Sequence, residues 1–299
     1  MIKLDRILCP VDLSEFSRHA LDHAFALAKW YDAHVTVLHV FSAAEPPLPL
    51  IGMPAGLPVL PAVHPDEVAE DVRRFCGPLP TVSRGCPAQI VVAEGDPAKH
   101  IVLQAERTDL VVMGTHGRSG FERLFLGSVT DRVLRTTHVP VLTVPQPVER
   151  PESVNYRTIL CPVDFSDAST RALTYALSLA EETDARLILL HVVEGVPEPP
   201  HFGEMGHLNV REYYRYLNED AMARLKAAVP DEARVWCRPD ERVVTGKAYR
   251  TILEVAAKDD AEVIVMGVHG TSVLHRRLFG STTHHVIREA ACPVLTLRA

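Results

Sequence analysis

The chain has 299 residues, of which 47% are hydrophobic and 23% charged, a balance that excludes disorder or a collagen-like fibre as its main state. At about 150 residues per domain, this length predicts two domains, each large enough to bury its own core. The formal net charge is -7, from 31 basic and 38 acidic residues. Binding to nucleic acid depends on clustered Lys and Arg, so we expect no nucleic-acid partner.

The chain shows no segment that would direct it to a membrane. Its first residues carry Lys3, Asp5 and Arg6 and lack the apolar run of a signal peptide. The longest apolar stretches, such as Leu187–Leu190, are far shorter than the roughly 20 residues of a transmembrane helix. We therefore expect a cytoplasmic protein without a membrane partner. The six cysteines show no CxxC spacing, so buried hydrophobic roles are favoured over disulfides or zinc ligands.

The sequence is an internal duplication. Residues 7–40 align without a gap on residues 159–192, with 18 of 34 positions identical, and residues 114–144 align on 267–297, with 14 of 31 identical. A repeat of about 150 residues is too long for a solenoid module, so the copies are tandem domains. We expect one domain over residues 1–147, called half one, and another over 154–299, called half two. Pro145, Pro147 and Pro151 lie in the linker between them.

In half one, short apolar runs alternate with segments of helical periodicity. Ser14 is the expected N-cap of the first helix. The expected elements are strand Arg6–Pro10, the helix after Ser14, strand His34–Val40, helix Asp66–Cys76, strand Ile90–Ala93, helix Pro97–Glu106, strand Asp109–Gly114, helix Ser128–Thr137 and strand Val139–Val144. Such alternation predicts parallel strands joined by crossover helices.

Half two repeats this order, with Ser166 as the N-cap of its first helix. Its second helix is expected over Arg211–Val229 and is longer than its counterpart, followed by a strand before Gly246, helix Tyr249–Lys258, strand Glu262–Gly267, a last helix and strand Pro293–Leu297. Each half is thus predicted to be an α/β, doubly wound, five-stranded parallel sheet, which binds ligands at the carboxyl ends of its strands. Pro140 and Pro293, early in each fifth strand, predict that this strand is an edge.

Residues shared by the halves gather after strands one, two and four. Asp12 and Asp164 follow the first strand, and Val40 and Val192 close the second. After the fourth strand, the pattern Gly-x2-Gly-x9-Gly-Ser occurs twice, at Gly114, Gly117, Gly127 and Ser128 and at Gly267, Gly270, Gly280 and Ser281. Glycines let backbone N–H groups approach an anion, and the positive end of the following helix dipole attracts it. Ser128 and Thr130, like Ser281 and Thr283, are candidate hydroxyl donors. No Gly-Lys-[Ser/Thr] follows, so a Walker-type NTPase is excluded.

With this glycine signature complete in both halves, the chain resembles a tandem universal stress protein over nearly its whole length. The resemblance implies a Rossmann-like fold with strand order 3-2-1-4-5 and pairing of the two fifth strands within one chain, as an intramolecular pseudo-dimer that could form a further homodimer. It also implies an ATP site, at which Mg²⁺ could bind together with the nucleotide.

The resemblance assigns roles to matching residues. Asp12 would hydrogen-bond the ribose and the backbone of Val40 would meet the adenine. Gly114, Gly117, Gly127, Ser128 and Val129 would hold the phosphates. The corresponding residues of half two are Asp164, Val192, Gly267, Gly270, Gly280, Ser281 and Thr282. The sequence leaves open whether one half or both bind ATP.

Three functional interpretations remain. The first is a nucleotide-dependent stress-response or signalling module that acts by changing conformation or partner. The second is a slow ATPase, in which Asp12 and Asp164 could hold magnesium and Arg118, Arg123 and Arg276 are candidate charge stabilisers, although no arginine finger or catalytic glutamate is recognisable. The third is an interaction scaffold with empty sites, in which the glycines are turn residues and the aspartates are helix caps.

Other conspicuous residues favour structural roles. His116 is expected to be a solvated loop residue, and His39 and His191 are expected to be satisfied by nearby backbone. The spacing of His201, His207, His284 and His285 does not fit a metal site. Tyr213, Tyr214 and Tyr216 are expected to pack half-buried on a charged helix. Residues 46–65 contain seven prolines and are expected to form a loop.

Overall fold

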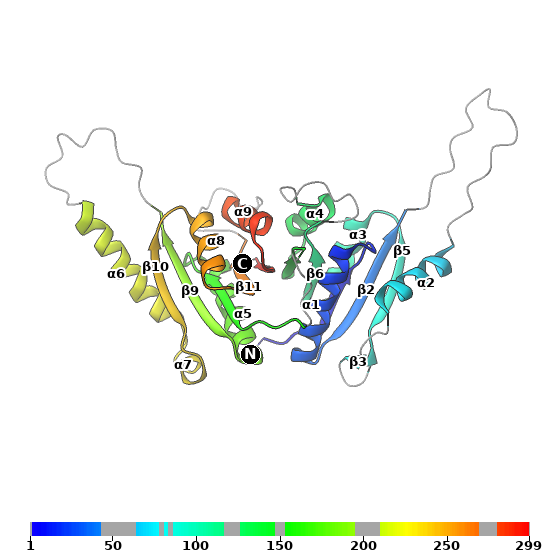
Figure 1. The fold of residues 1–299 in the computed structure, drawn as a ribbon, viewed down its shortest axis with the longest axis horizontal. Coiled ribbons are helices and arrows are strands. Elements are labelled where there is room, and N and C mark those ends of the chain that lie inside the picture. Colours follow the sequence, from blue (N-terminus) through cyan, green and yellow to red (C-terminus); the bar gives the residue numbers. More distant parts are fainter. Residues whose placement is uncertain are drawn as a thin grey trace, which may run out of the picture.

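The structure is a computed structural model, and it describes residues 2–42, 64–77, 81–82, 86–116, 126–146, 153–194, 210–268 and 280–298. Within these residues, ten strands form one continuous sheet, with helices on both faces (Figure 1). The strand order is β10-β9-β8-β11-β12-β7-β6-β1-β2-β5.

The strands of half one are β1 (Arg6–Pro10), β2 (His34–Phe41), β5 (Gln89–Glu94), β6 (Leu110–Gly114) and β7 (Val141–Val144), and they pair in parallel. Those of half two are β8 (Thr158–Pro162), β9 (Arg186–Val193), β10 (Asp240–Thr245), β11 (Val263–Gly267) and β12 (Val294–Leu297), also parallel. Counted within each half, the order is 3-2-1-4-5. The carboxyl ends of all five strands therefore meet at one edge of each half.

The two halves join through their fifth strands. β7 and β12 pair antiparallel, with Leu142 opposite Leu295. Thr143 Oγ1 donates to the carbonyl of Val294, and Thr296 Oγ1 donates to the carbonyl of Val141, each at 3.1 Å. These strands are edges of their own halves but internal in the combined sheet, whose outer strands are β5 and β10.

The helices form two layers because each presents an apolar stripe to the sheet. One face carries α1 (Glu15–Tyr31), α2 (Pro65–Cys76), α5 (Asp167–Thr183) and α6 (Val210–Ala228), packed on a core that includes the fully buried Cys9 and Cys161. The other face carries α3 (Pro97–Ala105), α4 (Ser128–Thr136), α8 (Ala248–Lys258) and α9 (Ser281–Glu289). Among the described residues, no helix is long and apolar enough to cross a membrane.

The structure differs from the sequence-based expectations at a few boundaries. Pro140 and Pro293 lie just before β7 and β12 rather than inside them. Their carbonyls still accept from Val111 N and Ile264 N, at 3.0 and 2.9 Å, because proline lacks only the donor. The sequence analysis also did not predict the short strands β3 (Thr81–Val82) and β4 (Cys86–Pro87), nor the one-turn helix α7 (Ala233–Trp236).

Candidate functional site

The loop after the first strand adopts the same tight turn in both halves. In half one, Oδ1 of Asp12 accepts from N and Oγ of Ser14, at 3.1 and 2.5 Å. Leu13, between them, has a φ of 64°, a left-handed conformation that costs a bulky residue about 1–2 kcal/mol. Half two repeats this turn with Asp164, Phe165 and Ser166. The helix caps are Ser14 and Ser166, so the aspartates themselves do not cap the helices.

A histidine fastens this loop to the second strand. His39 Nδ1 lies 2.8 Å from the carbonyl of Val11, and His191 Nδ1 lies 2.7 Å from that of Val163. Since a carbonyl only accepts, each ring carries its proton on Nδ1. The expectation that backbone satisfies these histidines is confirmed. The contact brings the aspartate loop beside the end of β2 or β9, where Val40 and Val192 lie.

The first glycine of each signature ends the fourth strand against the first helix. A Cβ on Gly114 would lie 3.1 Å from Phe16 Cβ, and one on Gly267 would lie 2.8 Å from the backbone of Ala168 and Ser169. Packing alone therefore disfavours a side chain at both positions, and more strongly at Gly267. The same approach places the loops after strands one and four side by side.

The last described glycine of each signature starts a helix. Gly127 N donates to the carbonyl of Thr115 at 2.8 Å, and Gly280 N donates to that of Val268 at 3.0 Å. Added Cβ atoms would lie 3.2 and 2.7 Å from those same carbonyl oxygens. Each glycine thereby closes the loop between the fourth strand and the next helix.

In the described part of the chain, the helices α4 and α9 begin without a side-chain cap. Their N-cap residues are Gly127 and Gly280, and among the described residues no side chain accepts from their first turns. Ser14 caps α1 and Asp96 caps α3, whereas the N-cap side chains of α2 and α8 also make no capping hydrogen bond. At the starts of α4 and α9, Ser128 and Ser281 are exposed, and Val129 and Thr282 are half-buried. Backbone donors at such an end attract an anion.

The two threonines of these first turns do not serve an anion. Thr130 Oγ1 donates to the carbonyl of Gly114, and Thr283 Oγ1 donates to that of Gly267, both at 2.9 Å. Both side chains are buried. The expectation that they supply hydroxyl donors to a phosphate is therefore wrong, because these hydroxyls tie each helix to the end of the fourth strand.

His116 follows the first glycine of half one and is not a solvated loop residue. Its ring lies 5.3 Å from that of Phe16, and its Nδ1 lies 3.0 Å from Thr115 Oγ1. Its Nε2 is buried and has no hydrogen-bond partner among the described residues. A shielded nitrogen without a partner beside the α4 N-terminus is a polar atom that a ligand could satisfy.

Several residues singled out in the sequence lie outside the described residues. They are Gly117, Gly270, His201, His207, Arg118, Arg123, Arg276 and nearly all of the proline-rich segment 46–65. Across the part of the chain that the structure describes, no group of three or more His, Cys, Asp or Glu side chains could hold a metal ion.

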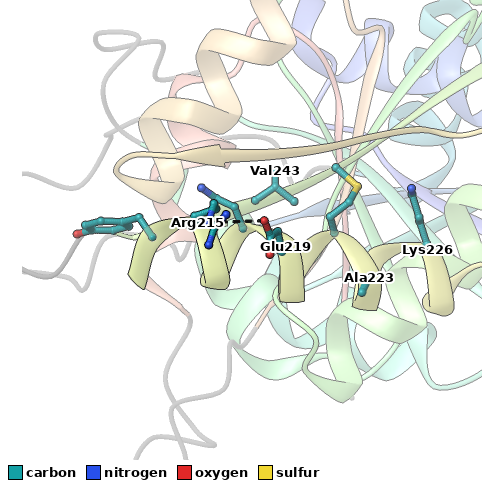
Figure 2. Close-up of a pocket in the computed structure, with 8 residues that line it drawn as sticks. Arg215, Glu219, Ala223, Lys226 and Val243 are labelled. Carbon is teal, nitrogen blue, oxygen red and sulfur yellow. Dashed lines mark ion pairs between the residues drawn. The ribbon is translucent and has the colours of Figure 1, made fainter. Parts of the chain in front are cut away.

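A groove of about 870 Å³ lies elsewhere, on the outer side of half two between α6 and β10 (Figure 2). Its lining includes Tyr214, Met222 and Val243, but none of the candidate site residues. Tyr214 is half-buried as expected, whereas Tyr213 and Tyr216 are exposed, so the packing prediction is wrong for those two. The groove is separate from the strand-end site.

Each half is thus a doubly wound α/β unit with an aspartate turn and an uncapped helix at the carboxyl ends of its strands. A model described as the universal stress protein family matches residues 3–145 and 155–298. The chain belongs to this family, with two copies of its domain in tandem.

Individual relatives agree with this assignment. A universal stress protein of Mycolicibacterium smegmatis is 26% identical over 301 residues, covering 98% of this chain and 96% of the relative. Universal stress protein MJ0531 of Methanocaldococcus jannaschii is 35% identical over 149 residues, covering 48% of this chain and 82% of that protein. The crystal structure of a universal stress protein from Archaeoglobus fulgidus, 22% identical, matches the fold with a TM-score of 0.63 and 99% coverage of both chains.

Proposed function

We propose that each half binds ATP at the carboxyl edge of its sheet, and that the bound nucleotide changes the conformation or the partner of this protein in a stress response. Asp12 binds the ribose and the backbone of Val40 contacts the adenine. The amides of Ser128 and Val129, with the glycines of the signature, hold the phosphates. Half two uses Asp164, Val192, Ser281 and Thr282 in the same way. Mg²⁺ accompanies the phosphates as a counter-ion.

One observation carries this proposal. The same pair of features occurs twice, at equivalent strand ends: an aspartate in a strained turn, and beside it a helix that begins at a glycine and has no described side-chain cap. Strained backbone and uncapped helix ends both cost stability, so a purely structural scaffold gains nothing by repeating them.

The electrostatics suit a phosphate group. The N-terminus of a helix carries roughly half a positive charge, and its N–H groups point at the ligand. The first turn of α9 has no acidic side chain, and the one in α4, Asp131, is paired with Arg135 at 2.8 Å, so phosphates would supply negative charge at both ends. In half one, the buried Nε2 of His116 lies near the same helix start, and it donates to a phosphate in the tautomer in which Nδ1 accepts from Thr115 Oγ1.

The joined sheet connects the nucleotide site of each half to the other half. β7 is hydrogen-bonded to β6 on one side and to β12 on the other, so the fourth and fifth strands of both halves form one structure. We propose that this junction makes the chain an intramolecular pseudo-dimer, in which the state of one nucleotide site is felt by the other half.

Charge substitutions at the helix starts test the proposal. Ser128→Asp and Ser281→Asp place a carboxylate in the first turn of α4 or α9, where acidic residues stabilise a helix by about 0.3–1 kcal/mol. The same carboxylate repels phosphate and takes up the free amides. Each variant should therefore fold but lose ATP binding in its own half. Ser128→Asn and Ser281→Asn are the matched neutral controls and should still bind.

The readout is thermal unfolding with and without Mg·ATP. A ligand at about 100 times its Kd stabilises a folded protein by about 2.7 kcal/mol per site, so ATP should raise the melting temperature of the wild type and of the Asn controls. The double variant Ser128→Asp/Ser281→Asp should melt at the same temperature with and without ATP. A wild-type protein that shows no shift at millimolar Mg·ATP would overturn the proposal.

A further inference from the structure

Arg298, from half two, caps a helix of half one. It follows β12, and its Nη2 donates to the carbonyls of Leu134 and Arg135 at 2.8 and 2.6 Å. These carbonyls belong to the last turn of α4, where backbone acceptors have no partner within the helix. Arg171, on α5 of half two, donates to the carbonyl of Arg298 at 2.9 Å and so holds the cap in place.

Arg298 caps the carboxyl end of α4, and the proposed phosphate site lies at the amino end of the same helix. α4 has nine residues, so at 1.5 Å per residue its two ends are about 13 Å apart. A cation at the carboxyl end complements the helix dipole, as an anion does at the amino end. The cap ties the carboxyl end of α4 to half two, as Thr130 Oγ1 ties the amino end to Gly114, and the two contacts together orient the first-turn N–H groups.

Among the residues that the structure describes, this cap has no equivalent in the other direction. The repeat aligns Val144 with Leu297, so the residue of half one that corresponds to Arg298 is Pro145, which has no side-chain donor. Among the described residues, no side chain donates to the carbonyls of Ile287 and Arg288, the counterparts of those that Arg298 caps. The contact therefore makes half one depend on half two, and not the reverse.

We propose that Arg298 is a positioning residue for the nucleotide site of half one: by capping α4 from half two, it sets the affinity of half one for ATP and leaves that of half two unchanged. This inference rests on the proposed function, since it concerns the same site. Because coupling is reciprocal, ATP bound to half one strengthens the contact between Arg298 and α4.

The test separates the two sites before removing the cap. In the Ser281→Asp background only half one binds Mg·ATP, and in the Ser128→Asp background only half two does. Adding Arg298→Ala should raise the Kd of half one about fivefold, at the low end of measured couplings between sites, and should leave the Kd of half two unchanged. Arg298→Lys keeps the positive charge but lacks the planar guanidinium that donates to both carbonyls. Its Kd for half one should therefore lie between those of the wild type and Arg298→Ala.

Arg238, an exposed arginine before β10, provides the charge-matched control, and Arg238→Ala should change neither Kd. Thermal unfolding without nucleotide checks that every variant is folded. Two results would overturn this inference and leave the proposed function standing. In both, wild type binds ATP in half one, and Arg298→Ala either leaves that Kd unchanged or raises both Kd values equally. Binding confined to half two would also overturn it. A wild-type chain that binds no ATP in either half would instead overturn the proposed function, and this inference with it.

Discussion

Gly114 and Gly267 occupy equivalent positions but differ in how closely the first helix approaches them. The nearest atom to an added Cβ is Phe16 Cβ at 3.1 Å for Gly114, whereas Gly267 faces backbone atoms of α5 at 2.8 Å. Both contacts involve atoms of or next to a helix backbone, but the approach at 2.8 Å requires a larger shift of the helix than the approach at 3.1 Å. Overpacking of this kind costs about 1–3 kcal/mol.

We therefore expect Gly267→Ala to lower the free energy of unfolding by about 3 kcal/mol and Gly114→Ala by about 1 kcal/mol. Chemical denaturation of the two variants measures this difference, with the midpoint and the slope determined separately. Equal losses, or a larger loss for Gly114→Ala, would show that the close approach to α5 does not determine the need for glycine.

At the residue scale, the sequence shows which positions lack a side chain but not what approaches them. The glycine spacing can be recognised in the sequence because it occurs twice. The contact of Gly114 with Phe16 cannot, because it depends on how α1 packs. The left-handed φ of Leu13 and Phe165 could not be predicted either, because bulky residues disfavour that region. Thr130 looked like a ligand donor because its backbone acceptor, Gly114, is 16 residues away in sequence.

At the scale of elements, the junction of β7 and β12 depends on two buried hydroxyls related by the repeat. Thr143 is fully buried and Thr296 is 2% exposed, and each donates to a carbonyl of the opposite half. A buried hydrogen bond contributes about 1 kcal/mol. Replacing threonine by valine keeps the shape and removes the donor.

Thr143→Val and Thr296→Val should therefore each lower the free energy of unfolding by about 1 kcal/mol, and by similar amounts, because the two contacts are equivalent. Thr143→Ser and Thr296→Ser keep the hydroxyl and should recover that hydrogen bond. If the serine variants lose more stability than the valine variants, the stabilisation comes from packing of the methyl group and not from the hydrogen bond.

Most elements were predictable because apolar periodicity is local and strong. The unequal second helices followed from sequence, and the structure gives α2 12 residues and α6 19. The strands β3 and β4 have two residues each, too few to show a period. The start of the fifth strand was placed too early because Val139 and Pro140 extend the apolar run although they lie before β7.

At the scale of the whole molecule, a buried histidine lies where the halves pack together. His23, on α1, is 2.7 Å through Nδ1 from the hydroxyl of Tyr156, at the start of half two, and His19 stacks edge-on at 4.8 Å. Burial, with a smaller contribution from His19, lowers the pKa of His23 from 6.5 to about 3. The folded protein therefore holds this ring neutral while the unfolded chain takes up a proton.

The sign of the resulting pH dependence follows. The folded pKa lies below the unfolded one, so the stability contributed by neutral His23 is complete above about pH 6.5 and is lost as the pH falls toward 3. Between pH 7.5 and 5.0 the loss should be about 2 kcal/mol. His23→Asn keeps an acceptor near the position of Nδ1 but does not titrate, so its free energy of unfolding should fall less over this range. If denaturation measurements show that the free energy of unfolding of His23→Asn falls with pH as steeply as that of the wild type, His23 is not the source of the pH dependence.

The contacts between the two halves could not be predicted from the pattern of residues in the sequence. The prolines at residues 140 and 293 predict an edge for each half, but what meets that edge followed only from the family resemblance. Arg298 gave no signal at all, since its acceptors are backbone carbonyls 164 and 163 residues away. Contacts between domains are set by their docking, which a local pattern does not encode.

The number of ATP molecules bound per chain tests the central claim most directly. Equilibrium titration with Mg·ATP should give two for the wild type, one for Ser128→Asp or Ser281→Asp, and none for the double variant. No binding to the wild type, or two molecules still bound by the double variant, would contradict a nucleotide site at the start of α4 and α9.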